Sequence, residues 1–487
     1  MTDDRKEISR RDFASRMGVA AAAIAAGGAA IGREAGAAPL VSNRVLGAND
    51  RVVVASIGIR GQGNALKRGF AKLKNVEIKT LCDVDENLFA ERANDKALAD
   101  VPTFKPGYQQ DLRRVLEDKD IDGVVIATPN HWHALATIWA LQAGKHVYVE
   151  KPCSYSVWEG RKMVEAARKH NKIVQVGTMN RSRPAVRHGI QFLHEGGIGR
   201  IYMARGLCFK TRPAIGKYPD GPMQPGEKYR LNVEARNYEP TYDGAYLGKV
   251  NYDLWLGPAP QRPFNRNRFH YNWHWHWDTG NGDTGNQGPH QFDIARWGMK
   301  KDEHPVKVSS MGGYYGEPAS QETPDLQTSC FEYADGTILE FATRGGHTNE
   351  EGTQRIGNLF YGTKGWLWID GDGRKWQSYL GRKEEKGPGS EAPPEEGGSD
   401  PTVLTSIEYP HYQNFVDAVR AGDAKILTCD ILEGHLSATL PHLANVAYRV
   451  GRALVFDGKT ETCVGDAEAT KMLRRDYRKG FEIRDAV

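Results

Sequence analysis

The chain has 487 residues, with 65 Lys and Arg against 61 Asp and Glu and a formal net charge of +4. So small a charge for this length excludes an extended basic surface, and we expect no nucleic-acid partner. Six scattered cysteines show neither metal-ligand nor disulfide-framework spacing, so we expect no metal site. Cys82 and Cys330 lie in apolar, strand-like runs, which predicts that both are buried thiols.

The N-terminus has the pattern of an export signal. Two arginines at positions 10 and 11 precede an uncharged stretch rich in Ala and Gly (17–32), and Ala35-Gly36-Ala37 resembles a cleavage site. The paired arginines favour the twin-arginine route, so we assign residues 1–37 to a signal recognised by the twin-arginine translocase. We therefore expect a periplasmic protein, which an uncleaved signal would tether to the membrane.

From residue 51 the chain alternates strand-like and helix-like segments. Apolar runs predict strands at 52–57, 76–82, 123–127, 146–149 and 173–176. One helix is predicted from about residue 133 to 143, and another opens at a capping box formed by Ser156 and Glu159 and ends near residue 170. Short apolar strands separated by such helices predict a parallel sheet that is covered on both faces.

A glycine-rich turn, Gly58-Ile59-Arg60-Gly61-Gln62-Gly63, follows the first strand. It supplies the first and last glycines of G-x-G-x-x-G, and Asp83 lies about twenty residues further on, at the end of the second strand. Amides of such a turn bind a pyrophosphate at a helix N-terminus, while the aspartate accepts hydrogen bonds from the adenosine ribose. Asp83, with Asp85 nearby, would repel a 2′-phosphate, so the pattern favours NAD over NADP. In the alternative interpretation the glycines serve only a tight turn.

Glu150-Lys151-Pro152 comes directly after the strand at 146–149. The carboxyl ends of strands in an open parallel sheet are where such sheets bind ligands. Alone, the tripeptide is an ordinary charged strand end. After a glycine turn and Asp83, it places a lysine where a nicotinamide ring would lie.

The pattern changes after Gly177. Long, partly alternating strands are predicted at 200–209, 306–315, 326–344 and 355–370, with an Asp-Gly hairpin turn at 334–337. Helical spacing of apolar residues begins near 412 and again near 432. We interpret 179–460 as an α+β domain with an antiparallel sheet, 383–400 as a solvated loop and 461–487 as a C-terminal tail.

Together these motifs resemble the glucose-fructose oxidoreductase, inositol dehydrogenase and MocA family (Gfo/Idh/MocA). Besides the glycine turn and Glu150-Lys151-Pro152, the resemblance rests on 82–85, on Thr128-Pro129 with His133, on 253–258 and on 285–293. It implies a doubly wound Rossmann domain over 48–178 and a C-terminal α+β domain with an open, mainly antiparallel sheet. It also implies a homo-oligomer formed through that sheet and NAD(P)-linked chemistry on sugars or polyols.

The resemblance also implies roles for individual residues. Beyond the glycine turn and Asp83, the residues that it adds to the cofactor site are Thr128, Pro129, Asn130, His133, Glu150 and Lys151. Lys151 would stabilise the developing alkoxide and His290 would accept its proton, helped by a helix that begins just before His290. Many family members carry an aspartate where this chain has Asn286, so the third catalytic position holds an amide. Asp283 or Asp293 could serve His290 instead, and the sequence does not choose between them.

A tryptophan- and histidine-rich segment, 273–278, lies between these motifs. We expect His274, His276 and Asp278 to contact sugar hydroxyls, together with Asn180 and Arg181 after the strand at 173–176. Two other interpretations are a metal-binding His-x-His pair, which lacks a third ligand at a recognised spacing, and a buried aromatic strand.

These expectations converge on an exported NAD-dependent oxidoreductase of a sugar, polyol or sugar derivative. Because free NAD is scarce outside the cytoplasm, such an enzyme should hold its cofactor tightly and recycle it. One alternative is a glycoside hydrolase that oxidises a ring carbon transiently and eliminates the aglycone. A second alternative is a non-catalytic nucleotide- or sugar-binding accessory protein.

Overall fold

The structure is a computed structural model that describes residues 51–221, 249–346, 355–391 and 409–487. The chain divides into two units, Met1–Val41 and Ser42–Val487, and every described residue belongs to the second unit. The expected export signal (1–37) therefore lies outside the described residues. In the described part of the chain, every helix is too short or too polar to cross a membrane.

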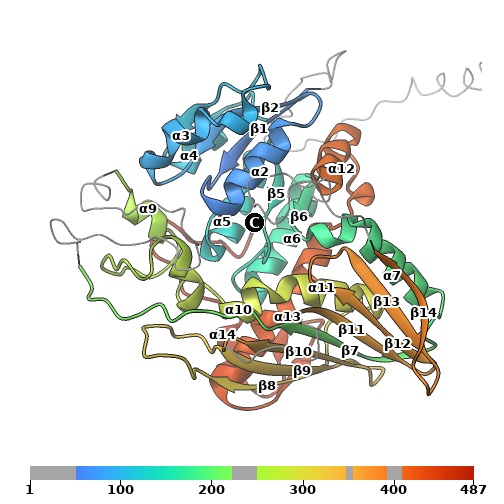
Figure 1. Cartoon of the computed structure of the whole chain (residues 1–487). Coiled ribbons are helices and arrows are strands. Elements are labelled where there is room, and N and C mark those ends of the chain that lie inside the picture. Colours follow the sequence, from blue (N-terminus) through green and yellow to red (C-terminus); the bar gives the residue numbers. More distant parts are fainter. Residues whose placement is uncertain (1–50, 222–248, 347–354, 392–408) are drawn as a thin grey trace, which may run out of the picture. The chain divides into compact units, whose positions relative to one another are not determined.

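The first half of the described chain forms a six-stranded parallel sheet (Figure 1). Its strands are β1 (Val52–Ile57), β2 (Val76–Cys82), β3 (Gly107–Gln109), β4 (Gly123–Ile126), β5 (His146–Val149) and β6 (Val174–Val176). They lie in the order β3-β2-β1-β4-β5-β6, so the direction of winding reverses between β1 and β4. The predicted doubly wound Rossmann sheet is confirmed, and its reversal point is where such sheets bind ligands.

Helices connect these strands. They are α2 (Gly61–Ala71), α3 (Phe89–Ala93), α4 (Leu112–Glu117), α5 (Asn130–Gln142) and α6 (Val157–His170), with 3₁₀ turns η1 (Glu86–Leu88) and η2 (Lys96–Leu98). The start of α5 lies three residues before the predicted position, because Pro129 rather than a polar cap precedes its first turn. At α6 the predicted cap is present, since the Ser156 hydroxyl accepts from the Glu159 amide at 3.4 Å.

The second half is built on a ten-stranded sheet in the order β14-β13-β12-β11-β7-β10-β9-β8-β15-β16. Its strands are β7 (Ile201–Cys208), β8 (Lys307–Gly313), β9 (Leu326–Glu332), β10 (Ile338–Arg344), β11 (Ile356–Gly362), β12 (Gly365–Asp370), β13 (Lys375–Leu380), β14 (Glu385–Glu391), β15 (Leu454–Asp457) and β16 (Thr462–Cys463). Within this sheet the pairing of β7 with β10 is parallel, whereas the other described pairings are antiparallel. The predicted open, mainly antiparallel sheet is confirmed.

Helices cover one face of this sheet (Figure 1). The second half as a whole contains the helices α7 (Pro184–His194), α9 (Tyr252–Leu256), α10 (Gly282–Asn286), α11 (Gly288–Gly298), α12 (Tyr409–Ala421), α13 (Ile431–Val450) and α14 (Ala467–Met472), with 3₁₀ turns η3 (Met179–Ser182), η4 (His270–Trp275) and η5 (Ala424–Ile426). Phe292 of α11 packs against Phe331 and Phe341 of the sheet. Helix α12 packs instead against the first half, where Tyr412 stacks on Phe70 of α2.

Four expectations need correction. Residues 385–391, predicted as loop, form the edge strand β14, whose mostly exposed side chains lack the apolar alternation of a strand although its backbone pairs with β13. The predicted strand 355–370 is two strands joined by a tight turn. Cys330 is exposed, because it points to the open face of β9 while Phe331 points inward. Residues 461–487 are more than a tail, since Phe481, Ile483 and Val487 join the core of the Rossmann sheet.

Candidate active site

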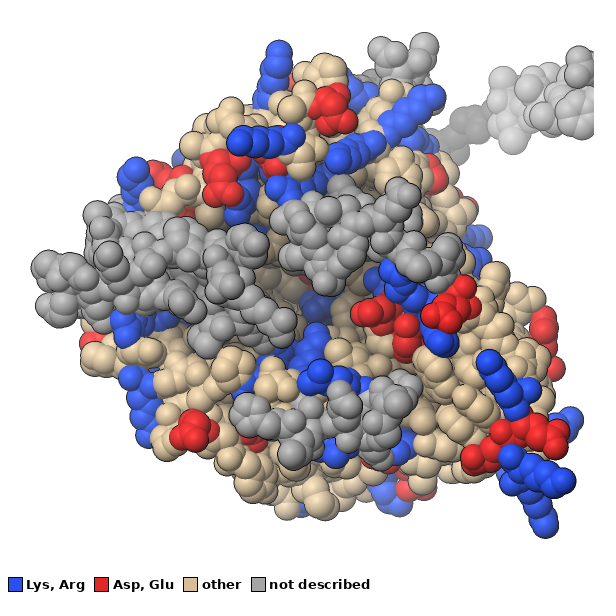
Figure 2. All heavy atoms as spheres, in the orientation of Figure 1, with Lys and Arg blue, Asp and Glu red and all other residues tan. Residues whose placement is uncertain are grey.

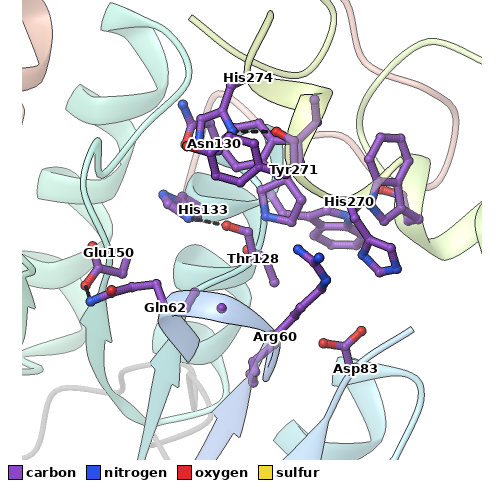
Figure 3. A pocket seen from close by; sticks show the side chains of 18 of the residues that line it. Arg60, Gln62, Asp83, Thr128, Asn130, His133, Glu150, His270, Tyr271 and His274 are labelled. Carbon is purple, nitrogen blue, oxygen red and sulfur yellow. Dashed lines mark hydrogen bonds between the residues drawn. The ribbon is translucent and has the colours of Figure 1, made fainter. Parts of the chain in front are cut away.

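A cavity of about 490 Å³ opens where the carboxyl ends of β1, β2, β4 and β5 meet residues of the second half. The first half supplies the glycine turn, Asp83, the segment after β4 and Lys151, while the second half supplies Lys210, residues of η4, and Asn286, Gln287 and His290. Figure 3 shows the side chains of both halves directed into the space between them. In Figure 2 the same region is a hollow near the centre of the view, with Lys and Arg atoms inside it.

The glycine turn is packed so closely that side chains have no room at its ends. Gly58 has a φ of +79°, and a Cβ there would lie 2.7 Å from the Ala127 carbonyl carbon. A Cβ on Gly63 would lie 1.7 Å from the Gly58 oxygen, whereas one on Gly61 would meet nothing within 4 Å. Gly58, Arg60, Gly61 and Gln62 line the cavity, and Ile59 and Gly63 pack beneath it. The open space over the start of α2 fits a bound diphosphate.

Asp83 lines the cavity beside the glycine turn (Figure 3). Its Oδ2 accepts from the Ile59 amide at 2.9 Å and its Oδ1 accepts from the Asp85 amide at 3.0 Å. Burial raises the pKa of Asp83 to about 6, and these amide hydrogen bonds oppose the shift. Each carboxylate oxygen keeps a free lone pair, so Asp83 can still accept from ribose hydroxyls. Asp85 is turned away from the cavity and pairs with His270 at 3.2 Å.

The residues after β4 connect the cofactor half of the cavity to Lys151. The His133 ring contacts the Thr128 oxygen at 2.7 Å and the Pro152 oxygen at 2.6 Å, and burial lowers its pKa to about 4. Thr128 and Pro129 line the cavity, and the buried Thr128 hydroxyl has no hydrogen-bond partner among the described residues. A dinucleotide could satisfy that hydroxyl, so this side of the cavity fits the cofactor.

Glu150 and Asn130 form hydrogen bonds that connect the segments around the cavity. The Glu150 carboxylate accepts from Gln62 Nε2 at 3.2 Å and from the Lys151 amide at 3.1 Å, so it links the glycine turn to the end of β5. The Asn130 amide donates to Asn281 Oδ1 at 3.1 Å and thereby ties α5 to the second half. Both residues also line the cavity.

Three residues named as catalytic lie together. Lys151 Nζ donates to the Asn286 main-chain oxygen at 2.9 Å and lies 3.4 Å from Asn286 Oδ1. Burial lowers the pKa of Lys151, opposed by Glu150 and reinforced by two further cations, Lys210 and Arg212. Since α11 begins at Gly288, His290 lies in its first turn, as predicted.

His290 lines the cavity from the second half. Burial, followed by the charge of Lys151, lowers the pKa of His290 well below its ordinary value. The two carboxylates that could have served it are engaged elsewhere. Asp283 forms a bidentate pair with Arg212 at 2.6 and 2.8 Å, and Asp293 pairs with Arg181 at 2.8 Å. Neither is a hydrogen-bond partner of His290, whose buried Nδ1 has none among the described residues.

Of the five residues expected to contact substrate, only His274 lines the cavity. The 273–275 segment lies in the 3₁₀ turn η4 rather than an extended strand, so His274 and His276 diverge. His276 contacts the Asn267 oxygen at 3.2 Å, and Asp278 pairs with Arg262. Arg181 is held by Asp293 and Glu433, and the buried Asn180 lies outside the cavity lining.

Several cavity residues were not expected from the sequence. Four lie outside the recognised motifs: Gln110, Lys210, His270 and Tyr271. Trp255, Trp273 and Gln287 lie inside recognised segments but were not named individually as site residues. Lys210 Nζ donates to Gln287 Oε1 at 2.7 Å, and the Tyr271 hydroxyl lies 3.5 Å from Arg212 Nη1. Gln287 lies inside the 285–293 motif, directly after Asn286, whereas the only sequence signal for Lys210 is its position just after a strand.

The described residues also contain a group that could hold a metal ion, away from the cavity: His304, His435 and Glu461. Sequence spacing does not reveal it, because its members come from three separate segments. Glu461 Oε1 contacts His304 Nε2 at 3.0 Å, His435 Nε2 at 2.7 Å and Arg161 Nη2 at 2.6 Å. The guanidinium on this same oxygen supplies the positive charge that a metal ion would bring, so the group is an ion-pair network in this structure.

Family models match both halves of the chain. The model described as an oxidoreductase family with an NAD-binding Rossmann fold (GFO_IDH_MocA) matches residues 52–178. The model of the oxidoreductase family C-terminal alpha/beta domain (GFO_IDH_MocA_C2) matches 243–360 and 404–483. Together the two models match more than half of the chain.

Individual relatives match shorter regions. A glycosyl hydrolase family 109 protein of Shewanella pealeana is 32% identical over 176 residues, which are 34% of this chain and 38% of that protein. A levoglucosan dehydrogenase of Pseudarthrobacter phenanthrenivorans is 42% identical over 96 residues, 20% of this chain and 25% of that protein. These matches therefore span well under half the length of the curated relatives.

Solved structures share the fold over a longer range. A levoglucosan dehydrogenase in complex with NADH and levoglucosan has a TM-score of 0.58 at 19% identity, covering 85% of this chain and 100% of that one. The aldose-aldose oxidoreductase from Caulobacter crescentus, complexed with glycerol, has a TM-score of 0.58 at 17% identity and covers 83% and 100%. At these identities the likeness establishes the fold alone.

Proposed function

The chain belongs to the Gfo/Idh/MocA oxidoreductase family, and we propose that it transfers hydride between NAD and a sugar, polyol or sugar derivative. The observation that carries the proposal is the position of the Lys151 ammonium. It lies in one cavity with the glycine turn, Asp83 and His290. A cation, a neutral base and a dinucleotide-binding edge in one cavity are the elements that oxidation of an alcohol requires.

NAD is the proposed cofactor. The backbone of the glycine turn would hold its diphosphate, Asp83 its adenosine ribose and Thr128 its nicotinamide half. The Asp83 carboxylate supports NAD over NADP, because a 2′-phosphate beside it would meet like charge. Bound NAD supplies the hydride acceptor. We further propose that it stays bound through many turnovers, because the export pattern of residues 1–37 indicates a destination where free NAD is scarce.

The chain's own residues would manage the charge and the proton. The Lys151 ammonium would stabilise the oxygen of the substrate as it becomes an alkoxide. His290, kept neutral by burial and by neighbouring cations, would accept the hydroxyl proton. Asn286 would fix the Lys151 side chain through its main-chain oxygen, 2.9 Å from Nζ.

The open face of the second sheet supports the proposal of a homo-oligomer. Met311, Leu326, Cys330 and Ile338 share this face by register and are exposed, with Met311 exposed by 73% and Ile338 by 40%. By register this face also carries Lys307, Glu332 and Glu340. Exposed apolar side chains among charged ones, on a sheet face that no described helix covers, are consistent with a protein interface. A second copy of this chain is the proposed occupant.

A cofactor-recycling glycoside hydrolase remains the alternative reaction at the same site. The similarity to a glycosyl hydrolase family 109 protein over about a third of the chain is consistent with it. Both reactions would begin with hydride removal at the same edge of the Rossmann sheet. They differ in whether the hydride returns to the same sugar.

One experiment separates the proposals. The protein is purified without added nucleotide, its bound cofactor is identified, and it is then offered free sugars and aryl glycosides. Conversion of bound NAD to NADH by a free sugar supports the dehydrogenase, and aglycone release over many turnovers without net NADH supports the hydrolase. Failure to bind nucleotide even after reconstitution contradicts both and leaves a non-catalytic accessory protein.

A further inference from the structure

Lys210 is a cavity-lining cation to which the proposed hydride transfer assigns no direct contact with the reacting atoms. It lies two residues beyond the end of β7, and its side chain is half-buried. Its Nζ donates to Gln287 Oε1 at 2.7 Å. Within the described part of the chain, no carboxylate oxygen lies within the 4.0 Å of an ion pair with this ammonium.

The neutral partner of Lys210 is itself held in place. Gln287 Nε2 donates to Gln291 Oε1 at 3.0 Å, which turns the Gln287 oxygen toward the lysine. An ammonium has three N–H groups and this contact uses one, so the other two remain for a ligand. The Lys210 ammonium is thus held in position by an uncharged partner, which does not neutralise its charge.

The other cations around the substrate half follow the same pattern. Lys151 donates to the uncharged Asn286, and Arg212 is already neutralised by both oxygens of Asp283. Of the other acids nearby, Glu150 accepts from Gln62 and from the Lys151 amide, and Asp372 is exposed. Among the described residues the substrate half therefore carries more positive than negative charge, and Figure 2 shows Lys and Arg atoms in the hollow.

We propose that the substrate carries an anionic substituent, a carboxylate or a phosphate ester, and that Lys210 recognises it. The inference rests on the proposed function and names its substrate class as sugar acids or sugar phosphates. The physical reason is that charged groups removed from water are normally paired, and the described residues provide no ion-pair partner for Lys210. An anion bound there would complete the pairing and would leave Lys151 free for the reacting oxygen.

The test measures binding apart from turnover. The complex of the protein with NADH is titrated calorimetrically with D-glucose, D-glucuronate and D-glucose 6-phosphate, and with the same three forms of D-galactose. The wild type is compared with Lys210→Gln and Lys210→Arg. Lys471→Gln, an exposed lysine of α14 outside the cavity, is the matched control. Reduction of NAD by each compound is recorded separately.

We expect an anionic form to bind the wild type at least about tenfold more tightly than the neutral sugar, since charge-assisted hydrogen bonds are the strong ones. That preference should shrink about tenfold in Lys210→Gln, survive in Lys210→Arg and Lys471→Gln, and decrease with added salt. Equal binding of neutral and anionic forms to the wild type, or an unchanged preference in Lys210→Gln, overturns the inference. Hydride transfer from neutral sugars without such a preference overturns this inference alone. A Lys210-dependent preference without any hydride transfer contradicts the proposed function and supports the anion site.

Discussion

The Lys151 ammonium and the Asn286 main-chain oxygen lie 2.9 Å apart, with the Asn286 side-chain oxygen at 3.4 Å. The contact joins β5 of the Rossmann sheet to α10 of the second half across the cavity. An amide fixes the lysine without adding charge, so the pKa of Lys151 lies below its ordinary value because of burial, which outweighs the opposing charge of Glu150 and is reinforced by the neighbouring cations. The pH dependence of the reaction should therefore report on this pair.

We predict that Asn286→Asp moves the alkaline limb of the pH–rate profile to higher pH. A carboxylate within 4 Å of the ammonium stabilises its charged form, which raises the pKa of Lys151 by about 1–3 units. The profile of kcat for hydride transfer measures the shift. Asn286→Leu is the control, because it removes the side-chain contact without adding charge and should leave the limb nearly in place. A limb that stays fixed in Asn286→Asp would assign that titration to a different group.

Replacing Lys151 by Met should lower kcat by about 10²–10⁴-fold while nucleotide still binds. The substitution keeps an unbranched side chain but removes the cation that would stabilise the alkoxide. Rapid-mixing measurement of NADH formation, alongside NADH binding by fluorescence, separates the two effects. Lys471→Met, on the exposed surface of α14, should change neither quantity. Full turnover in Lys151→Met would remove this lysine from the mechanism.

The cofactor half of the site could be predicted from sequence because each part is a local motif. The glycine turn, Asp83 and Lys151 each follow a strand of the parallel sheet, and the carboxyl ends of neighbouring strands meet at one edge. Apolar runs bounded by turns located β1, β2, β4 and β5 for the same reason. Strand β14 was not predicted, because its mostly exposed Glu, Lys and Gly residues show no alternation of apolar and polar positions.

The substrate half could not be predicted in this way, since only the fold brings its parts together. Lys210 follows β7 and meets Gln287 across 77 positions of sequence. Arg181 was expected in the cavity, but Asp293 of α11 and Glu433 of α13 hold it elsewhere. Partners this distant leave no spacing pattern in the chain.

Asp83→Asn should weaken NADH binding by about tenfold and narrow the preference for NADH over NADPH. The amide accepts ribose hydrogen bonds less strongly than a carboxylate, and it no longer repels a 2′-phosphate. Because burial raises the pKa of Asp83 to about 6, NADH binding to the wild type should also weaken as the pH falls through that value. Fluorescence titration with both nucleotides measures these effects. Asp120→Asn, on an exposed aspartate, is the control, and a variant of Asp83 with unchanged selectivity would contradict its role.

The open sheet face predicts a charge-sensitive interface. Met311→Glu with Ile338→Glu would place two carboxylates on the proposed contact between copies, where each would lose hydration without a partner. Light scattering after gel filtration should show a smaller assembly than in the wild type. Lys375→Glu, on a different part of the same sheet, serves as the control for surface charge alone. An unchanged mass in the double variant would place the oligomer contact elsewhere.

Buried histidines predict that the fold loses stability in mild acid. His442, in the middle of α13, is buried with Nε2 3.3 Å from the Ser154 hydroxyl, and burial lowers its pKa from 6.5 to about 3. Below pH 6.5 the His442 imidazole therefore binds a proton in the unfolded chain but stays unprotonated in the folded chain. The resulting stability is fully present above pH 6.5 and is lost as the pH falls toward 3. Several other histidines act in the same direction, including the buried His131, His270 and His411 and the half-buried His146.

His442→Gln removes one of these titrations, so its free energy of unfolding should depend less steeply on pH than that of the wild type. One proton corresponds to about 1.4 kcal/mol per pH unit, so the difference between pH 7.5 and pH 5.5 should shrink by about that amount. Urea unfolding at the two pH values measures it. His188→Gln, an exposed histidine of α7, should leave the wild-type dependence intact. If His442→Gln and the wild type lose equal stability on acidification, His442 is protonated in the folded state and the lowered pKa is wrong.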